Sequence, residues 1–223
     1  MISHTEENYL KALYNLTSLK GEASVNDISK QLDIKMPTVN SMMKRLAEKQ
    51  LVVYESYRPL KLTAKGKKLA ALIIRKHRLT EMYLVEKMGF SWDEVHHIAE
   101  QVEHIQAPEF FIKMDELLGH PTVDPHGSPI PDAEGNIIEG SYQKLSEFKA
   151  GDTVTLMAVQ PSSEELLKFL TARELFLGVD LNIQQTEPFD GSMMVSYADK
   201  ENVTLSSKVC EKLLVAKKRK RKR

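Results

Sequence analysis

The sequence predicts a mainly α-helical N-terminal part, consisting of a winged helix and further helices, followed by a small, mostly β C-terminal domain. Apolar residues recur at helical spacing through most of the chain before residue 120, whereas short alternating runs dominate residues 146–216. Residues 120–136, which are rich in proline and glycine, separate the two patterns and predict an irregular strap. In a chain of 223 residues, this uneven pattern favours more than one domain.

Composition places the chain among soluble globular proteins, with 42% hydrophobic and 28% charged residues. The single cysteine, Cys210, excludes an intramolecular disulfide and fits a reducing, cytoplasmic location. No apolar run approaches the roughly 20 residues that a bilayer-spanning helix needs, and the polar, acidic N-terminus does not resemble a secretory signal. We therefore expect no membrane partner.

Charge is unevenly distributed along the chain. Seven of the 31 basic residues occupy the tail KKRKRKR, residues 217–223, which leaves 24 basic against 31 acidic side chains, a net charge of −7, in the rest. The formal net charge of zero therefore does not argue against nucleic-acid binding. We expect the tail to be solvated and to add non-specific phosphate contacts.

Three helices are predicted at the start of the chain: residues 5–19, 24–32 and 37–50. Ser3 and Glu6 form a capping box for the first helix, Gly21 ends it, and Pro37 lies in the first turn of the third helix. Only a few residues join the second and third helices. This arrangement is typical of a helix-turn-helix.

A predicted β-hairpin follows the helix-turn-helix. Its two β-type runs are LVVYE (51–55) and LKLT (60–63), and its tip contains Tyr57 and Arg58. A helix-turn-helix followed directly by such a hairpin predicts a winged helix, with the hairpin lying along the DNA backbone. The alternative is a generic helical hairpin without DNA binding, which the attached basic wing makes less favoured.

Three more helices are predicted before the strap: residues 64–88, 91–105 and 107–120. Ser91 and Glu94 offer a capping box for the middle helix, and Pro108 lies in the first turn of the last. After the strap, one helix is predicted at residues 162–176, among strands at 152–159, 178–185, 192–198 and 202–206.

Potential metal ligands gather on two of these helices. At about 100° per residue, one face of the segment VHHIAEQVEH carries His96, Glu100, Glu103 and His104. His77 and Glu81 share a face of the preceding helix, because they are four residues apart. There is no Lys or Arg between Lys87 and Lys113, so these carboxylates lack local cationic partners. The alternative is an ordinary amphipathic surface helix.

These histidines and carboxylates are suited to one or two divalent cations. Imidazole and carboxylate ligands without thiolate fit Mn²⁺ or Fe²⁺. Cys210 is expected to be a packed residue and His97 a neighbour of the site. We expect the remaining histidines, His4, His120 and His126, to be ordinary surface or loop residues.

Several stretches together resemble the diphtheria toxin repressor and manganese transport regulator family of bacterial metal-dependent repressors. These are RKHRLTEMYL (75–84), VHHIAEQVEH (95–104), PTVNSMMKRL (37–46) and the strap motif HGSPIP (126–131). The resemblance implies a winged-helix DNA-binding domain, a helical metal-binding and dimerisation domain with a Pro-rich strap, a small FeoA-like β-barrel domain and the basic tail. Their implied bounds are 1–74, 75–145, 146–216 and 217–223.

The resemblance also implies two adjacent metal sites in each subunit. One contains His77, Glu81 and His96, and the other contains Asn8, Glu100, Glu103 and His104. Two ions per subunit, Mn²⁺ with Fe²⁺ as the close alternative, are therefore expected. Three positions depart from one or both family patterns. Asn8 is neutral, where iron-type members have methionine and manganese-type members aspartate. Glu100 stands where iron-type members have cysteine and resembles the manganese-type choice, whereas Lys11 replaces an acidic ligand of the short manganese-type members. A loose match makes Glu164 or Glu165 a possible extra ligand, or simply a helix cap.

The resemblance implies a homodimeric repressor that binds a palindromic operator when loaded with metal and controls metal homeostasis genes. The DNA-facing side chains would be Pro37, Thr38, Asn40, Ser41 and Lys44 of the recognition helix and Arg58 of the wing. Two alternatives stay open. One is a helical di-metal enzyme, although the chain has no H-E-x-x-H motif. The other is a winged-helix DNA-binding protein without metal sensing.

Overall fold

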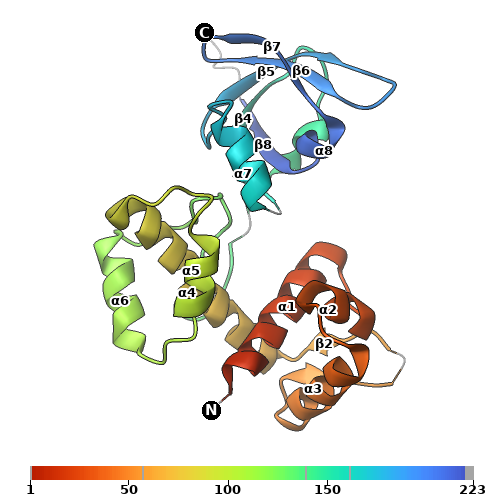
Figure 1. Ribbon diagram of the computed structural model, residues 1–223, viewed down its shortest axis with the longest axis vertical. Coiled ribbons are helices and arrows are strands. Elements are labelled where there is room, and N and C mark those ends of the chain that lie inside the picture. Colours follow the sequence, from red (N-terminus) through yellow and green to blue (C-terminus); the bar gives the residue numbers. More distant parts are fainter. Residues whose placement is uncertain (1, 57, 139, 161, 219–223) are drawn as a thin grey trace. The chain divides into compact units, whose positions relative to one another are not determined.

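The computed structural model describes residues 2–56, 58–138, 140–160 and 162–218 (Figure 1). The chain forms two compact units. The first contains the chain up to Thr80 with His97–Thr122 and Ile130–Ile138, and the second contains Glu81–His96, Val123–Pro129 and the chain from Glu139. None of the helices within the described ranges combines the length and the apolar character that a membrane crossing requires.

The predicted winged helix is present at the start of the chain (Figure 1). It consists of α1 (His4–Lys20), α2 (Val25–Leu32), α3 (Met36–Glu48) and an antiparallel hairpin of β1 (Val52–Val53) and β2 (Lys61–Leu62). Ser3 and Glu6 form the predicted capping box at the start of α1, and Gly21 ends that helix with a φ of 79°. The helices enclose a core that includes Tyr9, Leu10, Leu13, Ile28, Val39, Met43 and Leu46.

Helix α4 (Ala64–Met88) has the bounds that its apolar periodicity predicts. Gly66, in its first turn, allows the helix to pack closely on the wing. A Cβ atom at this position would lie 1.9 Å from the carbonyl oxygen of Leu51. Because α4 begins two residues after β2, it joins the wing directly to the residues predicted to bind metal.

Helices α5 (His96–Val102) and α6 (Pro108–Leu117) follow α4. α6 begins at the predicted proline. The prediction that α5 starts at residue 91 is wrong. The Ser91 N–H and hydroxyl both donate hydrogen bonds to Glu94, but they close a local turn, and the helix begins only at His96. A capping motif satisfies the donors of one turn and does not by itself extend a helix.

The strap, residues 120–136, consists of turns and an isolated bridge between Val123 and Pro129, as its composition predicts. Gly127 has a φ of 84°, and a Cβ atom there would lie 2.1 Å from the carbonyl oxygen of Met157. Only glycine fits this close approach. The Val159 N–H donates a 2.9 Å hydrogen bond to the His126 carbonyl, so the strap holds His126 in a defined position.

The C-terminal part forms a six-stranded antiparallel sheet, in the order β3, β8, β4, β5, β6, β7. Its strands are β3 (Gln143–Lys144), β4 (Thr153–Val159), β5 (Asp180–Thr186), β6 (Met193–Tyr197), β7 (Lys200–Leu205) and β8 (Leu213–Lys217). The helical segments are η1 (Leu145–Glu147), α7 (Glu164–Thr171) and α8 (Ser207–Cys210).

The predicted small β domain is confirmed, with one difference in its sheet. Among the described residues the sheet is not closed into a barrel, because β3 and β7 form its two edges. The prediction also missed the short β3 and α8 and the terminal β8. The core of this part includes Leu156, Leu170, Val195 and Cys210, and Trp92 packs into the same core.

Candidate metal centre

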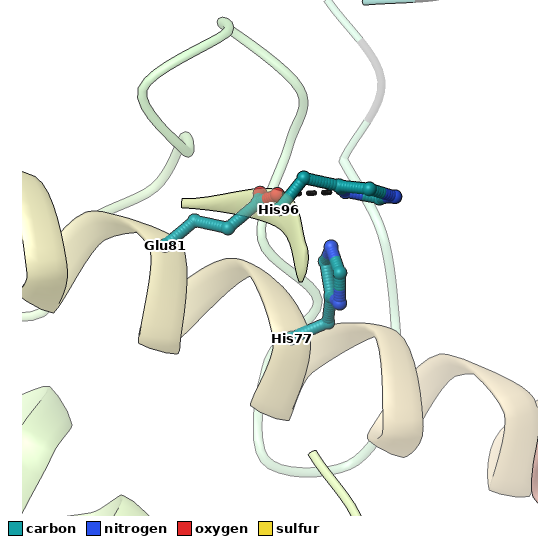
Figure 2. Close-up of side chains that lie close together, drawn as sticks. All are labelled: His77, Glu81 and His96. Atoms are coloured by element: carbon teal, nitrogen blue, oxygen red, sulfur yellow. Dashed lines mark hydrogen bonds and ion pairs between the residues drawn. The ribbon is translucent and has the colours of Figure 1, made fainter. Parts of the chain in front are cut away.

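Helix α4 presents His77 and Glu81 one turn apart, and both residues are largely buried, with 8% and 2% of their surface exposed. One ligand atom from each of His77, Glu81 and His96 lies within 4.8 Å of the other two (Figure 2). His96, the first residue of α5, places its Nδ1 3.1 Å from Glu81 Oε1. The structure thus brings together the three residues predicted for the first metal site, and their role as ligands stays a prediction.

Glu81 also belongs to a second potential ligand group, with Asp124 and His126 of the strap. All three residues are buried, and His126 Nδ1 lies 3.7 Å from Glu81 Oε2. His126 is held from its other side, where Nε2 lies 2.7 Å from the Trp92 carbonyl oxygen. Asp124 Oδ1 accepts hydrogen bonds from the N–H groups of His126 and Ser128. Two imidazoles therefore approach the two oxygens of one carboxylate.

His126 lies in a loop, as expected, but it is not an ordinary surface residue, because only 3% of its surface is exposed. Burial alone lowers the pKa of His126, but the nearby Glu81 and Asp124 carboxylates and the Trp92 carbonyl outweigh it and raise the pKa above its usual value. The sequence offered one weak signal for this residue. The motif Asp124-Pro-His126-Gly places two potential ligands beside a glycine, but it does not reveal Glu81 as their partner.

Glu103 is the most enclosed of the predicted ligands, with none of its surface exposed. Its Oε2 lies 2.6 Å from His77 Nδ1, and the Lys11 ammonium donates a 2.7 Å hydrogen bond to Oε1. Burial alone raises the pKa of Glu103, but the His77 hydrogen bond and the Lys11 charge outweigh it, so its pKa lies below the usual value. Glu103 is therefore a carboxylate that the fold keeps ionised.

The sequence places no cation near these carboxylates along the chain, but the fold brings one from a distant position. Lys11 of α1 lies 2.7 Å from Glu103 Oε1 and 3.6 Å from Glu100 Oε1. A bound ion is thus not needed as the sole source of positive charge for these carboxylates. The residue that departs from the family pattern supplies positive charge where a cation is expected.

The start of α1 also contacts the ligand segment. His104 Nδ1 lies 2.5 Å from Oε2 of the buried Glu7, and Gln106 donates a 3.1 Å hydrogen bond to Glu7 Oε1. Sequence reasoning missed Glu7, whose only signal is its position beside Asn8. Asn8 is exposed and borders an open hollow together with Glu100, His104 and His97.

The predicted second site is less compact than the groups on Glu81. Across the ranges that the structure describes, Glu100, Glu103 and His104 are not among the closely spaced ligand groups. They surround Lys11 and the hollow beside Asn8 instead. Their role as ligands stays a prediction.

The predicted DNA-facing side chains lie on α3 and at the tip of the wing. Pro37, Thr38, Ser41, Lys44 and Arg58 are exposed, and Asn40 is half-buried. The Tyr54 hydroxyl donates a 3.1 Å hydrogen bond to Asn40 Oδ1, and this bond orients the amide. A hollow bordered by Ser24, Asn40, Tyr54 and Arg58 lies between the helices and the wing. Tyr57, which was predicted at the tip, lies outside the described residues.

The candidate extra ligands are exposed at the start of α7. Glu164 pairs with Lys168, 2.5 Å away, and hydrogen bonds from its own backbone N–H and from the Ser163 side chain lower the pKa of Glu165. These contacts are those of a helix cap, and a ligand role for either residue stays a prediction. Cys210 is buried, and burial raises the pKa of its thiol to about 11. The candidate ligands are therefore imidazoles, carboxylates and the amide of Asn8, a set without thiolate that suits Mn²⁺ and Fe²⁺.

Three family models match successive parts of the chain. The N-terminal DNA binding domain of iron dependent repressors matches residues 1–60. Their metal binding and dimerisation domain matches residues 63–132, and the FeoA domain matches residues 143–217. The three matches follow the order that the sequence predicts.

Named relatives agree with these models. The iron-dependent repressor IdeR of Mycobacterium tuberculosis is 28% identical over 225 residues, which cover 96% of this chain and 97% of IdeR. The diphtheria toxin repressor of Corynebacterium diphtheriae is 33% identical over 153 residues, 69% of this chain and 68% of the relative. A solved structure of a manganese-dependent transcriptional repressor in complex with manganese is 28% identical, with a TM-score of 0.87, and covers 95% of this chain and 99% of that one.

Proposed function

Because the chain belongs to the iron-dependent repressor family, which includes the diphtheria toxin repressor, we propose that it is a homodimeric, metal-activated repressor acting in the cytoplasm. It binds a palindromic operator when loaded with Mn²⁺ or Fe²⁺ and controls metal homeostasis genes. One observation carries this proposal. The carboxylate of Glu81 belongs to two potential ligand groups. Glu81 itself lies on α4, the helix that begins directly after the DNA-binding wing.

We propose two ions per subunit, as the resemblance implies. His77, Glu81 and His96 hold one ion, with Asp124 and His126 as neighbouring donors. The other ion is held by Asn8, Glu100, Glu103 and His104. When bound, each cation supplies the positive charge that links side chains from separate segments of the chain.

DNA recognition is assigned to α3 and the wing. The exposed side chains of Thr38, Ser41 and Lys44 have the size and polarity to reach base edges, and Arg58 can contact a phosphate. Dimerisation is assigned to the helical segment. Phe110 and Leu117 of α6 expose 44% and 60% of their surface, and Phe111 packs inward. Exposed apolar side chains on one helix are typical of a surface that a partner covers.

Coupling between metal and DNA is assigned to α1. Lys11 and Glu7 contact the segment that carries Glu103 and His104, while the rest of α1 packs within the winged helix. A bound metal that fixes these contacts also fixes the position of the winged helix before it binds DNA. Ordering that is complete before DNA binding no longer opposes it, so metal occupancy raises DNA affinity.

The test uses a DNA duplex selected from a random pool by the metal-loaded protein. Its binding is measured by fluorescence anisotropy at buffered free concentrations of Mn²⁺, Fe²⁺ and Co²⁺ and in the presence of a chelator. We expect DNA affinity to increase with metal, and Trp92 fluorescence to change over the same range of concentrations. Equal DNA affinity with and without every cation would exclude metal sensing, while leaving DNA binding in place.

A further inference from the structure

Glu6 is a second buried carboxylate at the start of α1, and the predicted metal and DNA sites do not include it. None of its surface is exposed. Its Oε1 lies 2.9 Å from Arg45 Nε and 2.7 Å from Lys49 Nζ, and its Oε2 accepts a 2.7 Å hydrogen bond from the Ser3 N–H. Arg45 lies in the last turn of α3, and Lys49 caps the end of that helix. Glu6 therefore ties the start of α1 to the helix assigned to DNA reading.

The next residue, Glu7, connects the start of α1 to the segment that carries the predicted metal ligands. Glu7 contacts His104 and Gln106 of the ligand segment, at 2.5 Å and 3.1 Å. One turn later, Lys11 contacts Glu103. Successive residues of an α-helix point about 100° apart, so Glu6 and Glu7 face different neighbours from the same rigid turn. A shift in the ligand segment that moves this turn must also move the carboxylate that holds α3.

The contact between Glu6 and its two cations is of a kind that can transmit such a shift. Its two carboxylate oxygens lie within 2.9 Å of the Arg45 guanidinium, the Lys49 ammonium and the Ser3 N–H. A buried ionised carboxylate cannot leave its cations without a large desolvation cost. Arg45 and Lys49 must therefore follow Glu6, although both side chains are partly exposed, at 57% and 34%.

We propose that Glu6 is a positioning residue: through Arg45 and Lys49 it couples the position of α3 to the position of the start of α1. This inference rests on the proposed function, because it assigns the route by which metal occupancy reaches the DNA-reading helix. Its chemistry is that of a buried carboxylate shared by two cations of one helix. Glu6 touches neither metal nor DNA.

The decisive variant is Glu6→Gln, which keeps the length of the side chain and an oxygen that can accept the Ser3 hydrogen bond. The measured quantity is the coupling factor, defined as the ratio of the dissociation constants for the selected DNA duplex without and with Mn²⁺. Linkage requires the same factor in the effect of DNA on Mn²⁺ affinity, so both directions are measured. Glu48→Gln is the control, because it removes an exposed negative charge from the end of α3, the helix that carries Arg45.

We expect Glu6→Gln to reduce the coupling factor to less than about one third of the wild-type value, given the usual range of roughly 5–150-fold. Mn²⁺ affinity of the DNA-free protein stays unchanged. Glu48→Gln changes DNA affinity equally with and without Mn²⁺ and leaves the coupling factor intact. A folded Glu6→Gln protein with the full coupling factor would overturn the inference. A loss of DNA affinity that is equal in both metal states would do so too, because it indicates a structural role only.

A second variant, Lys49→Met, removes one cation and keeps Glu6. We expect a decrease of the coupling factor in the same direction, and the double variant should lose no more than Glu6→Gln alone, because both changes break the same contact. Additive losses would contradict the shared route.

A wild-type coupling factor of one would refute the proposed function itself. Normal wild-type coupling with unaltered variants would refute only the role of Glu6.

Discussion

Glu81 and Glu103 are both buried carboxylates near histidines, but different segments of the chain supply their partners. The two oxygens of Glu81 face the imidazoles of His96 and His126. Glu103 has His77 on one oxygen and the ammonium of Lys11 on the other. A neutral imidazole has a ring nitrogen whose lone pair can bind a metal, whereas an ammonium group has no lone pair and occupies the place of a cation.

This difference assigns separate tasks to the two regions. An ion can join the Glu81 groups with little rearrangement of the side chains, because their ligand atoms already lie within 4.8 Å of one another. An ion that binds Glu103 must compete with Lys11 or displace it. Since Lys11 belongs to α1, the proposed function implies that occupancy of the Glu103 region would change the contacts of the DNA-binding part.

The largest effect is expected from removing the carboxylate shared by both ligand groups. Glu81→Ala should weaken Mn²⁺ binding at these groups by at least about 100-fold, more than loss of an outer partner of a ligand typically costs. Isothermal titration calorimetry with Mn²⁺ measures the change. Glu86→Ala, an exposed glutamate on the same helix, is the control. An unaltered Mn²⁺ isotherm for Glu81→Ala would remove the contrast between the two regions.

Removing the ammonium tests the other side of the comparison. In metal-free protein, Lys11→Met leaves Glu103 buried without this cation and should lower the free energy of unfolding by about 3 kcal/mol. The loss should shrink at saturating Mn²⁺, because the bound ion replaces the lost charge. Urea unfolding with chelator and with Mn²⁺ measures both values. Lys20→Met, which breaks an exposed pair with Asp27, should cost less than about 1 kcal/mol. If Lys11→Met and Lys20→Met lowered the free energy of unfolding equally, Lys11 would be an ordinary surface charge.

Glu100→Ala separates metal binding from its effect on DNA. Glu100 lies 3.6 Å from Lys11, beside the hollow that Asn8 borders. Its removal should abolish the increase in DNA affinity with Mn²⁺, a loss of roughly 5–150-fold, and leave the Glu81 groups able to bind an ion. Fluorescence anisotropy with the selected duplex measures the increase, and the exposed Glu109→Ala is the control. Full metal-dependent DNA binding by Glu100→Ala would exclude Glu100 from the site.

The smallest effect is expected at the strap. His126→Asn keeps a polar side chain but removes one imidazole beside Glu81, and should weaken Mn²⁺ binding there by about tenfold. The exposed His120→Asn should leave it unchanged. Equilibrium dialysis at several Mn²⁺ concentrations resolves this difference. Identical Mn²⁺ affinities for the two variants would mean that His126 only supports the strap.

Local signals explain how much of the fold the sequence predicts. The capping box of Ser3 and Glu6 and the periodicity of α4 each act within a few residues, and the structure confirms both. The capping residues Ser91 and Glu94 were misleading, because their hydrogen bonds are equally satisfied by a single turn. β3 and β8 were missed because they pair with each other across most of the C-terminal part, which no local pattern records.

The ligand types and their local spacing follow directly from the order of residues along the chain. His77 and Glu81 share a face of α4 because the helix repeat places residues i and i+4 together. The partners of each carboxylate depend instead on how distant segments pack. His126 reaches Glu81 because the strap is held against β4, and Lys11 reaches Glu103 across 92 positions of sequence. The physical reason is that helix spacing depends on neighbouring dihedral angles, whereas charge compensation in a buried site depends on whichever side chains the packed elements bring together.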